Sequence, residues 1–171
     1  MALAVGLLVA GGLAAGLLLT SGSPAPAAPA FTLPSLAGGD PVTVPVRAQG
    51  TREPTVITFF ASWCGPCHAE LPMVATEAMK LRAAGTRVAF VGVDGNDDPA
   101  SGLAFARSSG VHFPVGKDTA SSVAPRFGIP GYPATVFVDA AGNVVHVVRG
   151  PVSKATLLTW VARIADSSHA G

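Results

Sequence analysis

The fold of this 171-residue chain is indicated most clearly by FFASWCGPC, residues 59–67. This stretch contains two cysteines, Cys64 and Cys67, with Gly65 and Pro66 between them. Residues 56–60, which lead into it, form a continuous apolar and β-branched run, as in strands buried on both faces of a sheet. The residues that follow it include an apolar set with the spacing of one helical face: Leu71, Val74, Ala78 and Leu81. The sequence therefore predicts a strand, then a cysteine-containing turn, then a helix.

The spacing of the only two cysteines excludes a disulfide framework and argues against a zinc site. A framework needs bridges that close long loops, whereas Cys64 and Cys67 enclose two residues. Zinc needs about four ligands, and the sequence has no second CxxC and no HxxxH, so the fold would have to bring in His68 and His112. Thiol–disulfide exchange remains, and it needs no metal and no cofactor beyond the Cys64–Cys67 pair.

Each cysteine has a different expected part in this exchange, because one thiolate must attack a disulfide sulfur and a second thiol must resolve the mixed disulfide. If the helix begins at the motif, Cys64 lies at its N-terminus, where free N–H groups and the helix dipole favour a thiolate. Cys67 then lies in the shielded first turn. We expect Cys64 to be the nucleophile and Cys67 the resolving thiol. Pro66 fits a first-turn position, where its missing N–H costs nothing.

The N-terminal residues 1–20 form an apolar appendage, because residues 2–19 carry no charged or polar side chain. As a helix at about 1.5 Å per residue, this run nearly matches the ~30 Å hydrocarbon core of a bilayer. We predict an uncleaved signal anchor, with the following domain outside the cytoplasm. The alternative is a signal peptide cleaved near Ala28-Pro29-Ala30, which would give a secreted protein. The net charge of +1 provides no basic surface for nucleic acid.

Residues 21–30 are rich in Pro and Ala and are typical of a semi-extended linker, so the folded domain is expected to be residues 31–171. Within it, strands are predicted over 31–36, 42–46, 56–60, 88–93, 113–115, 134–139 and 144–149, and helices after Cys67 and over 99–109, 119–127 and 153–166. The alternation of strands and helices indicates an α/β fold with a central mixed sheet covered on both faces.

From residue 31 to the C-terminus the chain resembles the thioredoxin superfamily. The resemblance rests on FFASWCGPC, on Pro72 five residues after the second cysteine, and on Gly131-Tyr132-Pro133-Ala134-Thr135. Other features are similar to the membrane-tethered, extracytoplasmic branch that contains TlpA, ResA and CcmG: CHAELP over 67–72, the helix over 99–109, Phe113-Pro114-Val115 and the Gly142 hairpin. The resemblance implies a thioredoxin-like fold with an extra βα insertion, an N-terminal transmembrane or signal segment, and redox chemistry at the two cysteines.

The resemblance also implies roles for residues around the dithiol. Pro133 is expected to be a cis-proline that faces the cysteines and guides the substrate, with Tyr132 as a tuner of specificity or else a surface aromatic. Glu70 resembles the acidic residue of the tethered branch and is expected either to handle protons or to be a solvated helix glutamate. Independently of the resemblance, the position of Trp63 directly before the turn predicts that it either packs beside the motif or belongs to the core.

One residue departs from the pattern of thioredoxin itself. Thr58 stands where thioredoxin has a buried aspartate that helps to deprotonate the resolving cysteine. The proton of Cys67 must therefore leave through water or through another acid, and Glu70 is the acid available nearby. His68 is expected to be exposed.

The leading functional hypothesis is a protein-disulfide reductase that acts on an exported partner, apocytochrome c being the partner that the branch suggests, and is itself reduced by a membrane electron donor. Gly65 and Pro66 between the cysteines, as in thioredoxin, favour a potential near −270 mV over the −120 mV of a strong oxidant. The alternatives are an oxidant or isomerase for exported proteins, a thiol peroxidase, whose PxxxTxxC pattern is absent, and a non-enzymatic peptide-binding module at Pro133.

Overall fold

The structure is a computed structural model and describes residues 25–48 and 50–166. The predicted anchor or signal peptide, residues 1–20, lies outside the described residues, as do residues 21–24 of the predicted linker. Within the described ranges, no helix is both long enough and apolar enough to cross a membrane.

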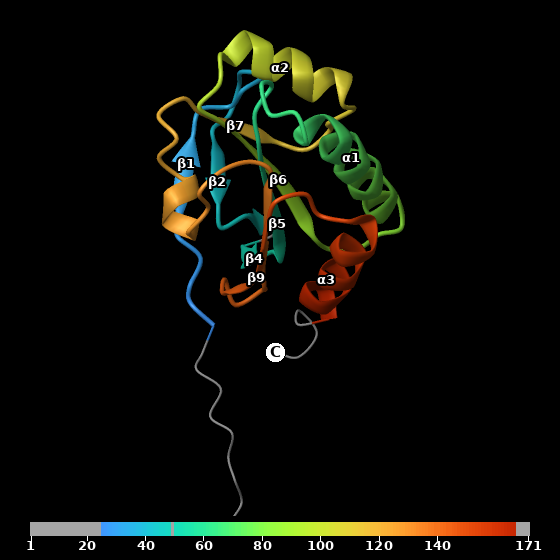
Figure 1. Ribbon diagram of the computed structural model, residues 1–171. Coiled ribbons are helices and arrows are strands. Elements are labelled where there is room, and N and C mark those ends of the chain that lie inside the picture. Colours follow the sequence, from blue (N-terminus) through green and yellow to red (C-terminus); the bar gives the residue numbers. More distant parts are fainter. Residues whose placement is uncertain (1–24, 49, 167–171) are drawn as a thin grey trace, which may run out of the picture.

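A five-stranded mixed sheet forms the centre of the fold (Figure 1). Its strands, in spatial order, are β7 (Val115–Asp118), β6 (Ala89–Gly95), β5 (Thr55–Phe60), β8 (Ala134–Val138) and β9 (Val144–Arg149). The central strand β5 runs parallel to β6 and antiparallel to β8. All six residues of β5 are buried, as its continuous apolar run predicts. The predicted central mixed sheet is confirmed.

Both faces of this sheet are covered. Alternate side chains of β5 point to opposite sides, and all of them are buried. On one side lie α1 (Cys67–Ala83) and α3 (Lys154–Asp166), against which Val56 packs. On the other side lie the hairpin β1 (Phe31–Leu33)–β2 (Val42–Val44) and the 3-10 helix η1 (Ala124–Phe127), against which Ile57 packs. The inserted helix α2 (Pro99–Ser108) crosses one end of the sheet, where Phe105 meets Phe60 with ring centroids 5.9 Å apart.

Two predicted elements differ from the structure in the segment after α2. The strand predicted over 113–115 begins instead at Val115 and continues to Asp118. The helix predicted over 119–127 is confined to η1, because the carboxylate of Asp118 accepts hydrogen bonds from the N–H groups of Ser122 and Val123 at 2.9 and 2.8 Å. Such a side chain to backbone turn competes with helix formation.

The end of the predicted linker lies along the domain. The N–H of Ala28 donates to the carbonyl of Gly142 at 2.8 Å, and the N–H of Val144 donates to the carbonyl of Pro26 at 2.8 Å. Contacts with the β8–β9 hairpin therefore begin at Pro26, five residues before the expected start at Phe31. A short hairpin that the sequence did not suggest, β3 (Arg47–Ala48) with β4 (Thr51–Arg52), precedes β5.

Candidate active site

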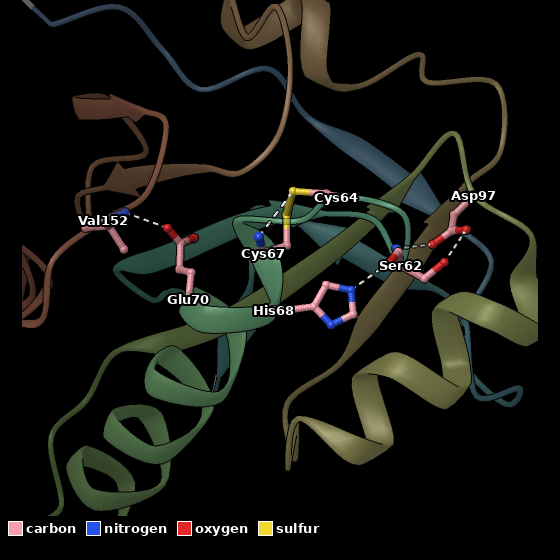
Figure 2. The surroundings of a disulfide bond; sticks show 7 residues. All are labelled: Ser62, Cys64, Cys67, His68, Glu70, Asp97 and Val152. Atoms are coloured by element: carbon pink, nitrogen blue, oxygen red, sulfur yellow. Dashed lines mark hydrogen bonds between the residues drawn. A yellow bond between two sulfur atoms is a disulfide. The ribbon is translucent and has the colours of Figure 1, made fainter.

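The two cysteines form a disulfide where β5 gives way to α1 (Figure 2). Their Cα atoms lie 5.3 Å apart. Cys67 is the first residue of α1, and its N–H is shared between two acceptors of Cys64, the carbonyl oxygen at 3.0 Å and the sulfur at 3.3 Å. The first N–H groups of a helix have no acceptor within the helix and carry partial positive charge, so this one stabilises negative charge on Cys64 Sγ.

The surroundings of the two sulfurs are apolar and shield Cys67 more than Cys64. The exposed fraction is 4% for Cys64 and 0% for Cys67. Gly65 and Pro66, between them, are both exposed, and Pro66 caps the helix rather than lying within its first turn. The buried residues that pack with the cysteines are Leu36, Phe60, Ala61, Leu71, Phe105, Ala106 and Val115.

Trp63 is 59% exposed, so its interpretation as a core residue is wrong. Its Nε1–H donates to the carbonyl of Asn96 at 2.8 Å, and its ring lies tilted against that of Tyr132 with centroids 5.9 Å apart. Trp63 therefore presents an aromatic face to solvent directly beside Cys64 in the chain.

The Tyr132–Pro133 peptide bond is cis, as the resemblance implies. The register of β5 and β8 pairs Phe59 with Ala134, which puts Pro133 at the end of β5 where the cysteine turn begins. Tyr132 is half-buried, packs against the residues around the disulfide, and shares a 2.9 Å hydrogen bond with the hydroxyl of Ser121. Burial raises the pKa of Tyr132. The alternative of a free surface aromatic is therefore wrong.

Glu70 is buried, so its interpretation as a solvated helix residue is also wrong. It lies one turn beyond Cys67, and its carboxylate is directed toward the N–H of Val152, which donates to it at 2.5 Å (Figure 2). Burial raises the pKa of Glu70 to about 7, although the Val152 N–H works in the opposite direction. A carboxyl with this pKa can take up or release a proton near neutral pH.

Thr58 is buried on β5, and its hydroxyl has no hydrogen-bond partner within the described part of the chain. The same holds for Thr135, which is its register partner on β8. Thr58 thus places a buried polar atom, but no acid, at the position where thioredoxin has an aspartate.

Sequence reasoning missed a group of polar residues that hold the turn before Cys64. The carboxylate of Asp97 accepts hydrogen bonds from both the N–H and the hydroxyl of Ser62, and His68, which is exposed as expected, donates from Nε2 to the Ser62 carbonyl at 2.8 Å. Asp94, at the end of β6, is buried. A signal was present: Asp94, Asp97 and Asp98 lie at the carboxyl end of the buried strand β6, and parallel strands carry functional side chains at their carboxyl ends.

A pocket of about 350 Å³ opens beside the exposed tryptophan. Its lining comes from the cysteine turn, the β6–α2 connection and the segment before Pro133: Trp63, Asn96, Ser121, Ala124, Pro125, Ile129, Pro130, Gly131 and Tyr132. A larger apolar groove of about 850 Å³ lies between α1 and β6 and contains neither cysteine. Among the described residues, no group of three or more His, Cys, Asp or Glu side chains could hold a metal ion.

The fold and the site define a thioredoxin-like domain with a CxxC disulfide at the start of its first long helix. The chain belongs to the AhpC/TSA family, whose model matches residues 24–147. The resemblance to the thioredoxin superfamily, and within it to proteins of the ResA and CcmG kind, is confirmed by the relatives and structures that follow.

Among curated proteins, the chain is 27% identical over 115 residues to the thiol-disulfide oxidoreductase ResA of Bacillus subtilis, which covers 67% of this chain. It is 32% identical over 117 residues to a thiol:disulfide interchange protein DsbE homolog of Paracoccus denitrificans, which covers 64% of this chain. The matches span 63% and 62% of the lengths of these two relatives.

Among solved structures, DsbF of Mycobacterium tuberculosis superposes with a TM-score of 0.67 at 33% identity, covering 78% of this chain and 94% of that one. A thiol:disulfide interchange protein of the thioredoxin family from Chlorobium tepidum superposes with a TM-score of 0.71 at 26% identity, covering 85% of this chain and 99% of that one. These similarities confirm the thioredoxin-like α/β fold.

Proposed function

We propose that this protein is an extracytoplasmic thiol–disulfide oxidoreductase that reduces disulfides in exported proteins. The observation that carries the proposal is the 3.3 Å hydrogen bond from the first N–H of α1 to the sulfur of Cys64. This N–H favours the thiolate of Cys64 over that of Cys67, which is fully buried. Cys64 is accordingly the attacking sulfur and Cys67 the resolving one.

The reaction transfers two electrons from the dithiol to the partner. In the reduced protein, the Cys64 thiolate attacks one sulfur of the partner's disulfide, forms a mixed disulfide and displaces the first partner thiolate. The deprotonated Cys67 then attacks Cys64 Sγ, which forms the Cys64–Cys67 bond of the present structure and displaces the second thiolate. The partner's two thiolates take up two protons from solvent, which balances the proton released when Cys64 ionises and the one that Cys67 gives up. A membrane electron donor then restores the dithiol.

We assign to Glu70 the role of accepting the proton of the Cys67 thiol. It lies three residues after Cys67, hence on the same side of α1, and it is buried with a pKa of about 7. An acceptor with this pKa can remove the proton of a shielded thiol at neutral pH and return it to solvent later.

The substrate would bind over Cys64, the less buried of the two cysteines, where Trp63 and Gly65 are exposed. The pocket between Trp63, Asn96 and Tyr132 offers an apolar seat for a side chain next to the target cysteine, and the segment before the cis-proline Pro133 borders it. Neither the pocket nor the segment before Pro133 requires a particular amino-acid sequence in the partner. This suits a partner that is recognised mainly at its disulfide. Apocytochrome c is the partner that we infer from the resemblance to the tethered branch.

The apolar segment over residues 2–19 supports an anchor that keeps this domain at the outer surface of the cell membrane. Residues 26–28 lie along the β8–β9 hairpin, so only residues 21–25 remain to space the domain from the bilayer.

The reduction potential of the Cys64–Cys67 pair tests the direction of electron flow. We expect a value well below about −180 mV in equilibrium with glutathione or a dithiol buffer, on the thioredoxin side of the known range. A value well above about −180 mV would overturn the reductase and favour an oxidant that introduces disulfides into exported proteins.

A further inference from the structure

The two residues that precede Cys64 are held by the connection between β6 and α2. The Asp97 carboxylate accepts from the Ser62 N–H and, at 2.8 Å, from the Ser62 hydroxyl (Figure 2). The carbonyl of Asn96 accepts from Trp63 Nε1–H at 2.8 Å. The carbonyl of Ser62 accepts a hydrogen bond from His68 on α1, so every polar group of Ser62 has a partner. The position of the attacking sulfur therefore depends on a segment more than 30 residues away.

A second carboxyl lies behind this contact. Asp94 on β6 is 2% exposed, and its Oδ1 has no hydrogen-bond partner within the described ranges. The backbone of α2 closes over it: a Cβ added to Gly102 would lie 2.1 Å from Asp94 Oδ2. Asp94 consequently has no room to turn toward solvent, whereas Asp97 is only partly buried.

These two carboxyls interact with each other. Burial raises the pKa of Asp94 to about 8, and the negative charge of Asp97, a hydrogen bond between the two side chains and the charge of Asp98 add to this rise. At neutral pH, Asp94 therefore keeps its proton, and Asp97 can carry the charge that binds Ser62.

We propose that Asp97 is a positioning residue for Cys64, and that Asp94 makes its hold on Ser62 sensitive to pH. While Asp94 is protonated, it is compatible with a charged Asp97 beside it. When Asp94 loses its proton, two like charges face each other in a site where only Asp97 can move, so Asp97 swings outward and releases Ser62. The effect of this release on disulfide exchange rests on the proposed function, but the release itself does not.

The other titratable and charged groups around the pair are few. Asp98 caps α2 and adds negative charge. Tyr132, in the segment before Pro133, lies close enough to Asp94 for the charge of that carboxyl to contribute to the raised pKa of Tyr132. Lys117 on β7 is in register with Asp94, but among the described residues it forms no ion pair with it. His68 reaches Ser62 from the opposite side. Of the groups named here, Lys117 is the only basic one that neighbours Asp94 in the sheet. Because it does not pair with Asp94, the Asp94 carboxyl has no cation beside it among the described residues.

The fluorescence of Trp63 in the oxidised protein tests the pH-sensitive contact, because no thiol titrates in that state and no turnover is needed. In a Trp160→Phe background we expect a transition near pH 8 between pH 6.5 and 9.5. It should be absent in Asp94→Asn, which cannot ionise, and in Asp97→Ala, which has no carboxylate to move. Should Trp160→Phe fail to fold, the signal of Trp63→Phe subtracted from that of the native protein gives the same curve.

Asp98→Asn is the matched control, since it removes a charge of the same sign one residue away, keeps a good helix cap and does not touch Ser62. The transition should persist there at a slightly lower pH. A transition that survives in Asp94→Asn would belong to another group and would overturn the proposal, whatever the outcome for the reductase.

Exchange rates of the reduced protein test the positioning role. With oxidised glutathione at pH 7, we expect Asp97→Ala to react about 10-fold more slowly than the native protein, because Cys64 loses its fixed approach. Asp97→Asn, which can still bond Ser62 but carries no charge, should react at least as fast as the native protein. Equal rates for Asp97→Ala and the native protein would contradict the positioning role.

Discussion

The carboxylate of Glu70 on α1 accepts a 2.5 Å hydrogen bond from the N–H of Val152, a residue 82 positions later that precedes α3. The contact joins the helix that begins at Cys67 to the segment that leads into the last helix. Glu70 is buried one helical turn beyond Cys67, and among the described residues no cation pairs with it. Burial therefore raises the pKa of Glu70 to about 7, and the hydrogen bond from Val152 offsets only part of this rise.

Glu70→Gln keeps an oxygen for the Val152 N–H but removes the titratable group. We expect the rate at which the reduced protein reacts with a protein disulfide to fall by about 10²-fold near pH 7, at the low end of general-base effects. The pH profile should also lose an inflection near 7. Stopped-flow kinetics from pH 5 to 9 measure both.

Glu77→Gln is the matched control for this experiment. Glu77 lies on the same helix and is also buried, but it pairs with Lys80 and Lys154 at 3.0 and 2.9 Å, and these contacts lower its pKa. Its loss should reduce stability and leave the pH profile of exchange unchanged. An equal change of profile in both variants would show that Glu70 has no specific part in proton transfer.

The raised pKa values of Glu70 and Asp94 make the folded protein less stable as pH rises. Each acid binds its proton more tightly when folded, so its stabilising effect is complete below its ordinary pKa of 4.5 or 3.8. This effect is lost as pH rises to about 7 for Glu70 and to about 8 for Asp94. Between these limits each group lowers the free energy of unfolding by up to about 1.4 kcal/mol per pH unit.

Urea unfolding from pH 4 to 9 measures this dependence on the oxidised protein. Asp94→Asn should flatten the curve between pH 4 and 8, and Glu70→Gln between pH 4.5 and 7. A native curve that instead rises throughout this range would mean that both carboxyls are ionised in the folded state.

The fold could be predicted from local pattern because its strands and helices bury their own side chains. The continuous apolar run of β5 requires cover on both faces wherever it lies, and the spacing of apolar residues in α1 requires a partner on one side. Asp118 shows the limit of this reasoning, since its side chain takes the N–H groups that a predicted helix would have used.

The site was less accessible from sequence because its chemistry depends on contacts between distant segments. Nothing near Glu70 in sequence indicates that Val152 will cover it, and Trp63 looks like a core residue until its bond to Asn96 is known. Asp97 shares no local pattern with Ser62, and only their positions at the ends of parallel strands connect them.

Gly95→Ala tests whether Tyr132 must be held beside the dithiol. A Cβ at this position would lie 2.0 Å from Tyr132 Oη and 2.6 Å from its Cζ, so the ring must move and lose its bond to Ser121. We expect a loss of about 1–3 kcal/mol in stability and slower reduction of protein disulfides. Thermal unfolding and exchange kinetics measure the two effects.

Gly65→Ala is the control within the motif itself. Within the described part of the chain, and apart from the two neighbouring residues, no atom lies within 4 Å of a Cβ added there, so the substitution meets no steric obstacle. Its stability should stay close to that of the native protein. A smaller loss in Gly95→Ala than in Gly65→Ala would contradict the importance of the Tyr132 position.

Cys67→Ser should trap the partner. The attack by Cys64 remains possible, but no resolving thiol follows, so a mixed disulfide through Cys64 accumulates in the cells that make this protein. Non-reducing electrophoresis and mass spectrometry identify the partner. Cys64→Ser, which leaves only the buried sulfur, should trap far less; full exchange activity in that variant would favour a binding module whose dithiol is not catalytic.

Thr58→Val tests whether the Thr58 hydroxyl, at the position where thioredoxin has an aspartate, has any part in proton transfer. The Thr58 hydroxyl is buried without a partner among the described residues, and such a group costs about 1–3 kcal/mol. Replacing it with a methyl group of similar shape should therefore raise the free energy of unfolding by about 1 kcal/mol. The rate and pH profile of disulfide exchange should not change, because the proton of Cys67 passes to Glu70.

Thr55→Val supplies the comparison on the same strand. Thr55 is equally buried, but its hydroxyl donates to the Glu53 carbonyl at 2.8 Å, so its loss should destabilise the protein by about 1 kcal/mol. Opposite signs for the two variants in urea unfolding would establish that Thr58 is unsatisfied. If Thr58→Val were destabilising and also slowed exchange, the hydroxyl would have to hold a buried water on the route of the proton, and Glu70 would no longer suffice as its acceptor.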